Sequence, residues 1–194
     1  MTAATLGVSP PNSTDGRHRP LSFAEHLADT GLEKCFGFWR AHKRGDRMPP
    51  KSALVMSRMP PDILPNLFLY ERTPEQRFRC RLAGTAVAQQ FGKDPTGCHL
   101  DELIVPASLE SRVTLFRRVL DAQCPVVYGG QLANSEHGWK PFKRLLLPVA
   151  NEDGASAFLF GMVLFPKPSR SGVYLVDSST GLDFEVWATP VETV

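Results

Sequence analysis

The apolar positions of the chain repeat first at helical spacing and later at strand spacing. Between residues 31 and 43, four of them recur at helical spacing and predict an amphipathic helix with one apolar stripe. A capping-box pattern over residues 22–25 predicts a shorter helix just ahead of it. Because the stripe is too apolar to stay in water, it packs on its own domain or against the same helix of a second chain. The stripe consists of Leu32, Cys35, Phe36 and Trp39.

The clearest strand signal is a strict alternation of arginine and apolar residues over positions 77–82. Successive side chains of a strand point to opposite faces, so Phe78, Cys80 and Leu82 are expected in a core. The intervening arginines then face outward. This pattern is typical of an antiparallel sheet with one covered face.

Other segments complete an order of two strands, several helices and three further strands. A hairpin turn at residues 151–154 joins the last two strands of this set, and Pro106 is expected to halt a brief helix over residues 99–104. The predicted strands span 66–71, 77–82, 126–132, 142–149 and 158–165, the predicted helices span 86–91 and 109–122, and short strands are expected at 173–176 and 184–187.

Composition along the chain predicts four regions. Residues 1–20 are rich in Pro, Gly, Ser and Thr and are expected to form a flexible tail. Residues 21–65 hold the N-terminal helices and a proline-rich connector, and residues 66–165 form the mixed α and β domain. Residues 166–194 are a C-terminal extension whose role the sequence leaves open.

Composition and charge exclude several classes of function. The chain has 194 residues, a net charge of +2 and 42% hydrophobic residues, which is ordinary for a soluble globular protein. So small a charge argues against a nucleic-acid partner, and no apolar run approaches the ~20 residues of a membrane span. Residues 1–20 lack the pattern of a secretory signal. The four cysteines are scattered, which favours free thiols and a cytoplasmic location.

No combination of residues predicts catalysis. Glycine-rich phosphate loops and the G-x-S-x-G nucleophile motif are absent from the sequence. Glu25, His26 and Asp29 could share a helix face and hold a metal, but such sets are common on solvated helices. His99 with Asp101 and Glu102 is interpreted as a capping cluster rather than a general base. We therefore expect neither an enzyme nor a metal protein.

The sequence resembles a bacterial family of stand-alone PAS domain proteins. Residues 78–85 (FRCRLAGT), followed by 91–94 (FGKD) and 96–97 (TG), resemble the RLxGT…FGxDxTG core of that family, and the likeness extends over about residues 21–165. Trp39 ahead of 47–49, the segment 62–66 and the segment 146–148 also fit. The resemblance implies an α+β, PAS-like fold: a five-stranded antiparallel sheet with short helices on one face, plus an N-terminal helical extension.

The resemblance further implies a sensory or regulatory module in signal transduction. Two hypotheses stay open: a small apolar ligand occupies a cavity between sheet and helices, or the cavity is filled by its own side chains and the protein is purely an interaction adaptor. Cys80 does not lie in the Asn-Cys-Arg motif of photoactive flavin PAS domains, and residues 109–122 contain no haem-ligating His, so flavin and haem are both disfavoured. No cofactor is expected.

Partners and site residues follow from the same comparison. PAS proteins often pair through an N-terminal helix, so the apolar stripe predicts a homodimer, with a downstream signalling protein as a further partner. We expect no nucleic acid and no membrane insertion. The candidate cavity-lining residues are Phe78, Cys80, Leu82, Phe91, Phe116, Leu120, Tyr128, Phe160 and Met162.

Overall fold

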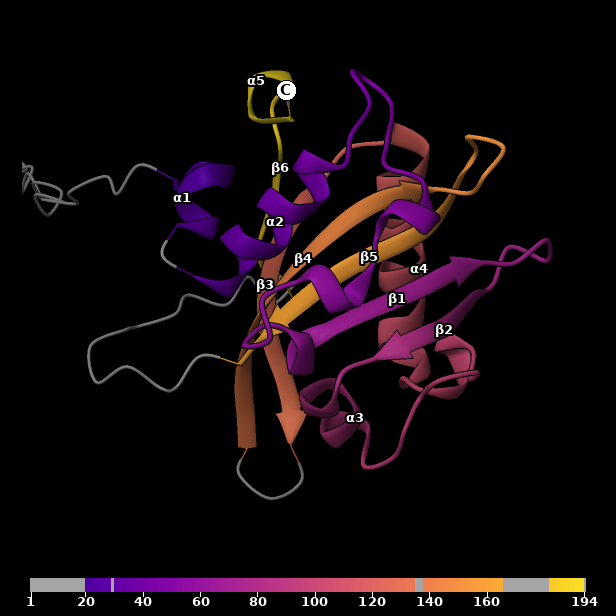
Figure 1. Cartoon of the computed structure of the whole chain (residues 1–194). Helices are drawn as coiled ribbons and strands as arrows, with labels where there is room; N and C mark the ends of the chain where they lie inside the picture. Colours follow the sequence, from indigo (N-terminus) through magenta and orange to yellow (C-terminus); the bar gives the residue numbers. More distant parts are fainter. Residues whose placement is uncertain (1–19, 29, 135–137, 166–181, 194) are drawn as a thin grey trace, which may run out of the picture.

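A single antiparallel sheet organises the chain (Figure 1). The computed structural model describes residues 20–28, 30–134, 138–165 and 182–193. Six strands lie in the order β2-β1-β5-β4-β3-β6, and every neighbouring pair is antiparallel. The strands are β1 (Leu67–Arg72), β2 (Phe78–Ala83), β3 (Val126–Asn134), β4 (Gly138–Ala150), β5 (Ser156–Leu164) and β6 (Leu182–Trp187).

Helices cover both faces of this sheet. In Figure 1, α1 and α2 cross in front of the sheet, whereas α4 lies behind it. The α-helices are α1 (Phe23–Leu27), α2 (Gly31–Ala41), α3 (Thr85–Phe91), α4 (Pro106–Ala122) and α5 (Pro190–Thr193). The 3-10 turns are η1 (Lys51–Ala53), η2 (Met56–Arg58), η3 (Leu64–Asn66) and η4 (Leu100–Glu102).

The predicted α+β fold class and antiparallel sheet are confirmed, with a sixth strand added. The sheet was expected to have five strands, but β6 pairs with β3 at its edge. Therefore the C-terminal extension supplies part of the same sheet. The strand predicted at 173–176 lies outside the described residues, as does the tail predicted at 1–20 apart from Pro20.

Helix ends follow from local capping chemistry. Ser22 and Glu25 form the predicted capping box, in which the Glu25 carboxylate accepts from the Ser22 backbone N–H at 2.7 Å. The Thr30 hydroxyl caps α2 by accepting from the backbone N–H of Leu32. After α3, Gly92 adopts a left-handed φ of 65°, which glycine does without a steric penalty.

Pro106 begins a helix, contrary to the prediction that it halts one. The helix α4 starts at Pro106 instead of the predicted residue 109, with Val105 as its N-cap residue. Proline suits the first helical position because its missing N–H would have no intrahelical acceptor there. The prediction was therefore wrong by about one turn at this end of α4.

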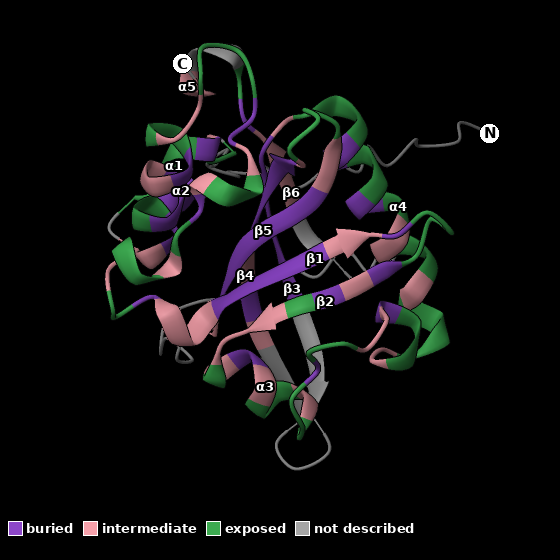
Figure 2. Ribbon diagram, turned by 45° about the vertical axis from the view of Figure 1, so that its right-hand side comes forward, coloured by how far each residue is buried: buried purple, intermediate pink, exposed green. Residues whose placement is uncertain are grey.

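The face of the sheet under α1 and α2, called here the α2 face, holds an apolar core to which both halves of the chain contribute. Leu67, Val127, Leu145, Leu147 and Phe160 are among its strand residues, and all are buried. Figure 2 shows the burial of β1, β4 and β5 as a continuous band through the centre of the sheet. The helices α3 and α4 lie on the opposite face, so the short helices of the domain and the N-terminal helical extension cover different faces of the sheet.

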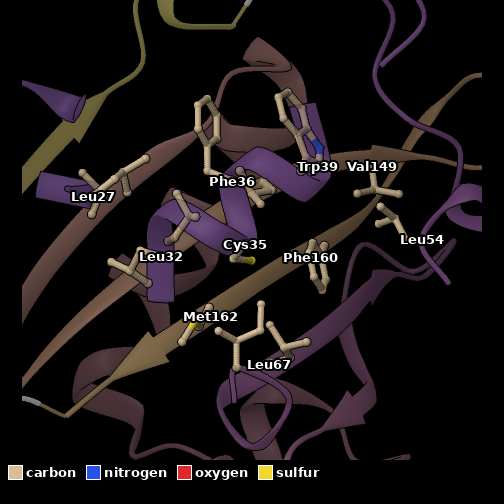
Figure 3. Close-up of a cluster of buried hydrophobic side chains, with 14 of the residues drawn as sticks. Leu27, Leu32, Cys35, Phe36, Trp39, Leu54, Leu67, Val149, Phe160 and Met162 are labelled. Carbon is tan, nitrogen blue, oxygen red and sulfur yellow. The ribbon is translucent and has the colours of Figure 1, made fainter. Parts of the chain in front are cut away.

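The apolar stripe of α2 points into this core (Figure 3). Leu32 and Cys35 are fully buried, and Phe36 and Trp39 are 7% and 1% exposed. The indole N–H of Trp39 donates to the backbone carbonyl of Pro148 in β4 at 2.8 Å. These four side chains are thus satisfied within their own chain, and they are not available as the predicted dimer interface. The homodimer itself stays a prediction.

A β-bulge changes the expected orientation of Leu82. Cys80 pairs with Tyr70 and Leu82 pairs with Leu69, so Arg81 is an extra residue between the two pairs. Phe78 and Cys80 therefore face α4, whereas Leu82 is only half-buried and packs on the α2 face. The strict alternation holds up to residue 80 and fails after it, because a bulge shifts the period of two by one residue.

The two ends of the described chain meet beside α2. The Glu192 carboxylate of α5 accepts from the backbone N–H of Ala24 at 3.1 Å. The Lys43 ammonium group donates to the backbone carbonyl of Thr193 at 2.8 Å. These contacts join α5 to the N-terminal helices, which gives the C-terminal extension a structural role.

Candidate functional site

The predicted cavity-lining residues do not form one site. The structure divides them between the two faces of the sheet, because alternate residues of a strand point in opposite directions. Phe160, Met162 and Leu82 pack on the α2 face. The remaining six lie on the other face, between the sheet and α3, η4 and α4, called here the α4 face: Phe78, Cys80, Phe91, Phe116, Leu120 and Tyr128.

Aromatic rings fill much of the α4 face. Phe116 of α4 packs edge-to-face on Phe78, with ring centroids 5.2 Å apart, and contacts Tyr70 at 5.5 Å. Tyr128 and Phe142, from neighbouring strands, pack edge-to-face at 5.8 Å. Such pairs contribute about 0.5–1.5 kcal/mol each beyond the area they bury.

Two arginines converge on one end of this aromatic cluster. Arg144 of β4 lies over the rings of Phe142, Tyr128 and Phe68 at 5.2, 5.8 and 5.7 Å. Arg112 of α4 lies over Tyr128 and Phe142 at 5.4 and 6.0 Å. Both guanidinium groups are therefore within 6.0 Å of the same Phe142 ring centroid although they come from different elements.

This arginine pair, Arg112 and Arg144, has no acidic partner among the described residues. The ion pairs there involve other cations. Arg144 donates from Nη1 to the Tyr128 hydroxyl at 3.0 Å, but its buried Nε–H has no hydrogen-bond partner in the described part of the chain. Burial raises the pKa of Tyr128 to about 12, which keeps its hydroxyl neutral at physiological pH. The pair thus places two positive charges in an aromatic setting.

Sequence reasoning missed both arginines. A signal was present for Arg144, because it alternates with Phe142 and Leu146 and must share their buried face. A charged residue at a core position of a strand is unusual and indicates a specific role. Arg112 offered no such signal, since a charge on an amphipathic helix is normally solvated.

The Cys80 thiol is buried, and its environment makes it a poor nucleophile. It donates a weak hydrogen bond to the Leu82 carbonyl at 3.4 Å. Burial raises its pKa to about 11, so the reactive thiolate is scarce at neutral pH. All four cysteines are free, and Cys35 is fully buried under α2.

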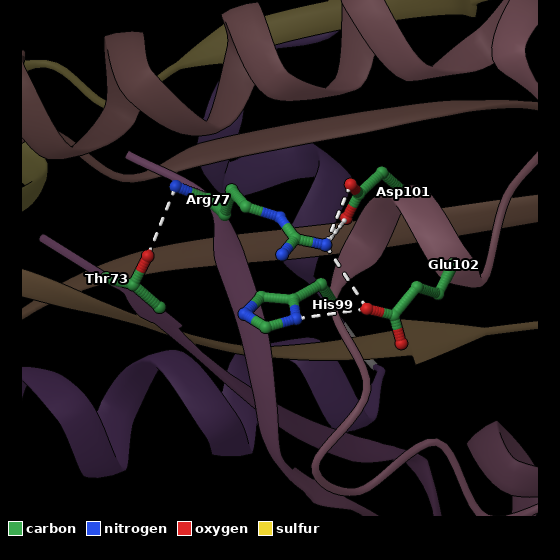
Figure 4. A network of polar contacts seen from close by, with 5 residues as sticks. All are labelled: Thr73, Arg77, His99, Asp101 and Glu102. Atoms are coloured by element: carbon green, nitrogen blue, oxygen red, sulfur yellow. Dashed lines mark hydrogen bonds and ion pairs between the residues drawn. The ribbon is translucent and has the colours of Figure 1, made fainter. Parts of the chain in front are cut away.

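His99, Asp101 and Glu102 form an ion-pair network with Arg77 rather than a helix cap (Figure 4). The Arg77 Nη2 contacts Asp101 at 2.9 Å and Glu102 at 3.2 Å, and His99 Nδ1 lies 3.1 Å from Glu102. The Arg77 guanidinium lowers the pKa of Asp101, and the hydrogen bond from His99 lowers the pKa of Glu102. The His99 side chain does not cap η4. Asp101 and Glu102 contact Arg77, which directly precedes β2, and Glu102 also contacts His99 within the same turn.

A further surface feature lies beside the edge strand of the sheet. A shallow groove of about 480 Å³ is lined by Arg118, Asp121, Ala122 and Trp187 at the edge strand β6.

The residues considered for a metal site do not assemble one within the described chain, where no group of three potential ligands occurs. Glu25 is used in the cap of α1, and Asp29 lies outside the described residues. None of the described helices has the length and hydrophobicity to cross a bilayer.

A family model of the PAS domain matches residues 28–164 of this chain. A search of the curated proteins found no match.

Solved structures are similar at low identity. A LOV protein from Rhodobacter sphaeroides is 15% identical with a TM-score of 0.41, over 54% of this chain and 61% of that one. An RNA-binding light-oxygen-voltage receptor is 19% identical with a TM-score of 0.39, over 61% of this chain and 36% of that one. The chain therefore spans less than two thirds of either protein.

These structures contradict one expectation from the sequence. Flavin was disfavoured because Cys80 is not in the motif of photoactive flavin PAS domains, yet both proteins are of the light-oxygen-voltage class to which that motif belongs. The absence of one cysteine motif therefore does not disfavour flavin for this chain. A likeness of this size concerns the fold and assigns no flavin site.

Proposed function

Because the chain belongs to the PAS domain family, a family of sensory and signalling modules, we propose that it senses a small ligand on its α4 face and reports occupancy to a partner protein. The single observation that carries the proposal is the difference between the two faces of the sheet. On the α2 face the side chains are mostly apolar, and the Lys143 ammonium group there donates to the backbone carbonyl of His26, whereas the α4 face brings Tyr128, Arg112 and Arg144 together among its aromatic rings. Polar groups set among apolar ones are what orient a small ligand.

A route from the site to the surface supports the signalling half of this proposal. Arg112 and Arg118 both lie on α4, and Arg118 contacts the Glu185 carboxylate of β6 at 3.0 Å. The Arg118 guanidinium also lies 5.0 Å from the Trp187 ring in the edge strand. A ligand that moves α4 relative to the sheet would alter these contacts. In this proposal a partner protein binds at the groove beside β6 and responds to the changed contacts. The protein acts in the cytoplasm as a homodimer.

A second candidate function is an interaction adaptor without a ligand. Its support is the tight packing of the α4 face, where Phe78, Phe116 and Tyr128 are at most 1% exposed. In this alternative the aromatic rings occupy the space that a ligand would take. In both candidates the protein is a non-catalytic module, and that remains a prediction.

Native mass spectrometry of freshly purified protein tests the proposal directly. Sensing predicts a bound small molecule, observed as added mass that is lost on denaturation, and the same spectrum reports the oligomeric state. Tyr128→Phe, which removes only the hydroxyl, should reduce the bound fraction. The adaptor alternative predicts an unmodified mass, and no thermal stabilisation in a screen of small molecules. That pair of results would refute the sensing proposal.

A further inference from the structure

We infer that the ligand of the α4 face is a small organic carboxylate, held by Arg112 and Arg144 together. This inference rests on the proposed function and adds the chemical class of the ligand. Its starting point is an imbalance of charge. Other arginines in contact with the sheet have carboxylate partners within 3.0 Å, namely Arg72 with Asp121, Arg77 with Asp101, Arg79 with Glu71 and Arg118 with Glu185. The arginine pair has none among the described residues.

The arginine pair carries an energetic cost that an anion would remove. A half-buried guanidinium loses part of its hydration, and this loss is normally offset by an opposite charge. Here the rings of Phe142 and Tyr128 offset part of it through cation–π attraction. Two like charges beside one ring also repel each other. A bound anion supplies the missing charge to both groups at once.

The donors of Arg144 are oriented but incompletely used. Its Nη1 donates to the Tyr128 hydroxyl, while its buried Nε–H finds no hydrogen-bond acceptor within the residues that the structure describes. A buried donor without an acceptor costs about 1–3 kcal/mol, so native proteins rarely keep one without a reason. A carboxylate is planar and accepts two parallel N–H bonds from one guanidinium. It would therefore satisfy the Nε–H and bring its charge toward Arg112.

The surroundings favour an anion with an apolar body. Phe68, Tyr128 and Phe142 provide ring surface around the guanidinium groups, and this surface rewards apolar contact rather than a hydrated ion. Inorganic phosphate would satisfy the arginines but gain nothing from the rings. An aromatic or aliphatic monocarboxylate uses both features.

The test compares carboxylates with their neutral amides. Thermal unfolding and isothermal titration calorimetry are carried out on the full chain with benzoate, hexanoate, benzamide, hexanamide and inorganic phosphate. The carboxylates should raise the unfolding midpoint and bind, while the amides and phosphate should bind at least about tenfold more weakly, since hydrogen bonds between charged groups contribute on that order.

Variants of the arginine pair then locate the site. Arg112→Gln and Arg144→Gln should each weaken carboxylate binding about tenfold or more. Arg117→Gln is the matched control, because it removes the same charge from the exposed side of α4, where Arg117 donates to the Gln76 carbonyl at 3.3 Å. It should leave binding within about twofold. If Arg144→Gln does not fold, Arg112→Lys provides the second variant, since it keeps the charge and loses the planar fork.

The outcomes separate the inference from the proposed function. Equal binding of carboxylates and amides, or carboxylate binding unchanged by the arginine variants, would overturn the inference. If native mass spectrometry then still shows a bound molecule, sensing stands and only the ligand class is wrong. If no probe binds and no molecule co-purifies, both fail. A co-purified molecule that ionises as a carboxylic acid, and whose retention is lost in Arg112→Gln, supports both.

Discussion

Trp39 provides the sharpest test of how the N-terminal helices are held. Its ring is 1% exposed, stacks on Phe36 with centroids 5.9 Å apart, and donates to the Pro148 carbonyl at 2.8 Å. Trp39→Ala removes this packing and should lower the free energy of unfolding by about 3–5 kcal/mol. Trp39→Phe keeps most of the ring but leaves the Pro148 carbonyl with one partner fewer, which costs about 1–3 kcal/mol.

Urea unfolding followed by far-ultraviolet circular dichroism measures these losses without relying on tryptophan fluorescence. With a slope of about 2 kcal/mol per molar urea, Trp39→Ala should shift the midpoint down by about 2 M. Trp187→Ala is the control, since that indole is only half-buried at the edge strand, and its shift should be smaller. Because Trp39 packs within its own chain, the shift should not depend on protein concentration.

Two results would refute this reasoning. A loss below about 1 kcal/mol for Trp39→Ala would mean that α2 does not pack on the sheet as described, since large buried aromatics cost more. A loss that grows on dilution would mean that Trp39 is buried by a second copy of the chain, as the apolar stripe alone had suggested. Sedimentation on the same samples would then show the dimer dissociating.

Three further predictions concern other parts of the chain. Gly161→Ala should lower the thermal midpoint by several degrees, because an added Cβ would clash with the backbone carbonyl of Leu145 and would lie 2.6 Å from the Phe68 ring. At Gly37 an added Cβ meets nothing within 4 Å, so Gly37→Ala should be neutral or stabilising. Asp101→Asn should make the stability of the protein less sensitive to acid. Because the pKa of Asp101 is lowered, its carboxylate stabilises the fold fully above the ordinary pKa of 3.8, and this stabilisation is lost as the pH falls through the lowered pKa. Urea titrations of both proteins at pH 7 and pH 3 would detect the difference. Iodoacetamide should leave Cys35 unmodified in the native protein and modify it in urea, since the thiol is fully buried and its pKa is raised. Peptide mass spectrometry measures the modification. The prediction is contradicted if Cys35 of the native protein reacts as fast as the half-buried Cys98.

The local elements could be predicted because their causes are local. The capping box at Ser22, the left-handed Gly92 and the alternation at Phe78 and Cys80 each depend on neighbouring residues only. The family resemblance over residues 78–97 then pointed to the PAS fold. The family match confirms that part of the interpretation.

The candidate site could be predicted only in part. Six of the nine proposed lining residues do share the α4 face, because they belong to segments whose inward side the sequence indicates. Leu82 was misassigned because a bulge at Arg81 inverts the remaining residues of β2, and no local pattern announces the bulge. Phe160 and Met162 were misassigned because β5 is apolar on both faces, so alternation cannot distinguish one face from the other.

The sequence by itself therefore determined where the helices and strands lie, that the sheet is antiparallel, and which side chains seek burial. Tertiary structure decided what buries them. The stripe of α2 is equally satisfied by a second chain or by its own sheet, since hydrophobic attraction has no direction, and only the folded chain shows that Trp39 reaches Pro148. The pairing of the two arginines likewise depends on the tertiary structure, although the alternation in β4 already indicates that Arg144 shares a buried face. Arg112 and Arg144 are 32 positions apart, and only the packing of α4 against β4 places both charges beside one ring.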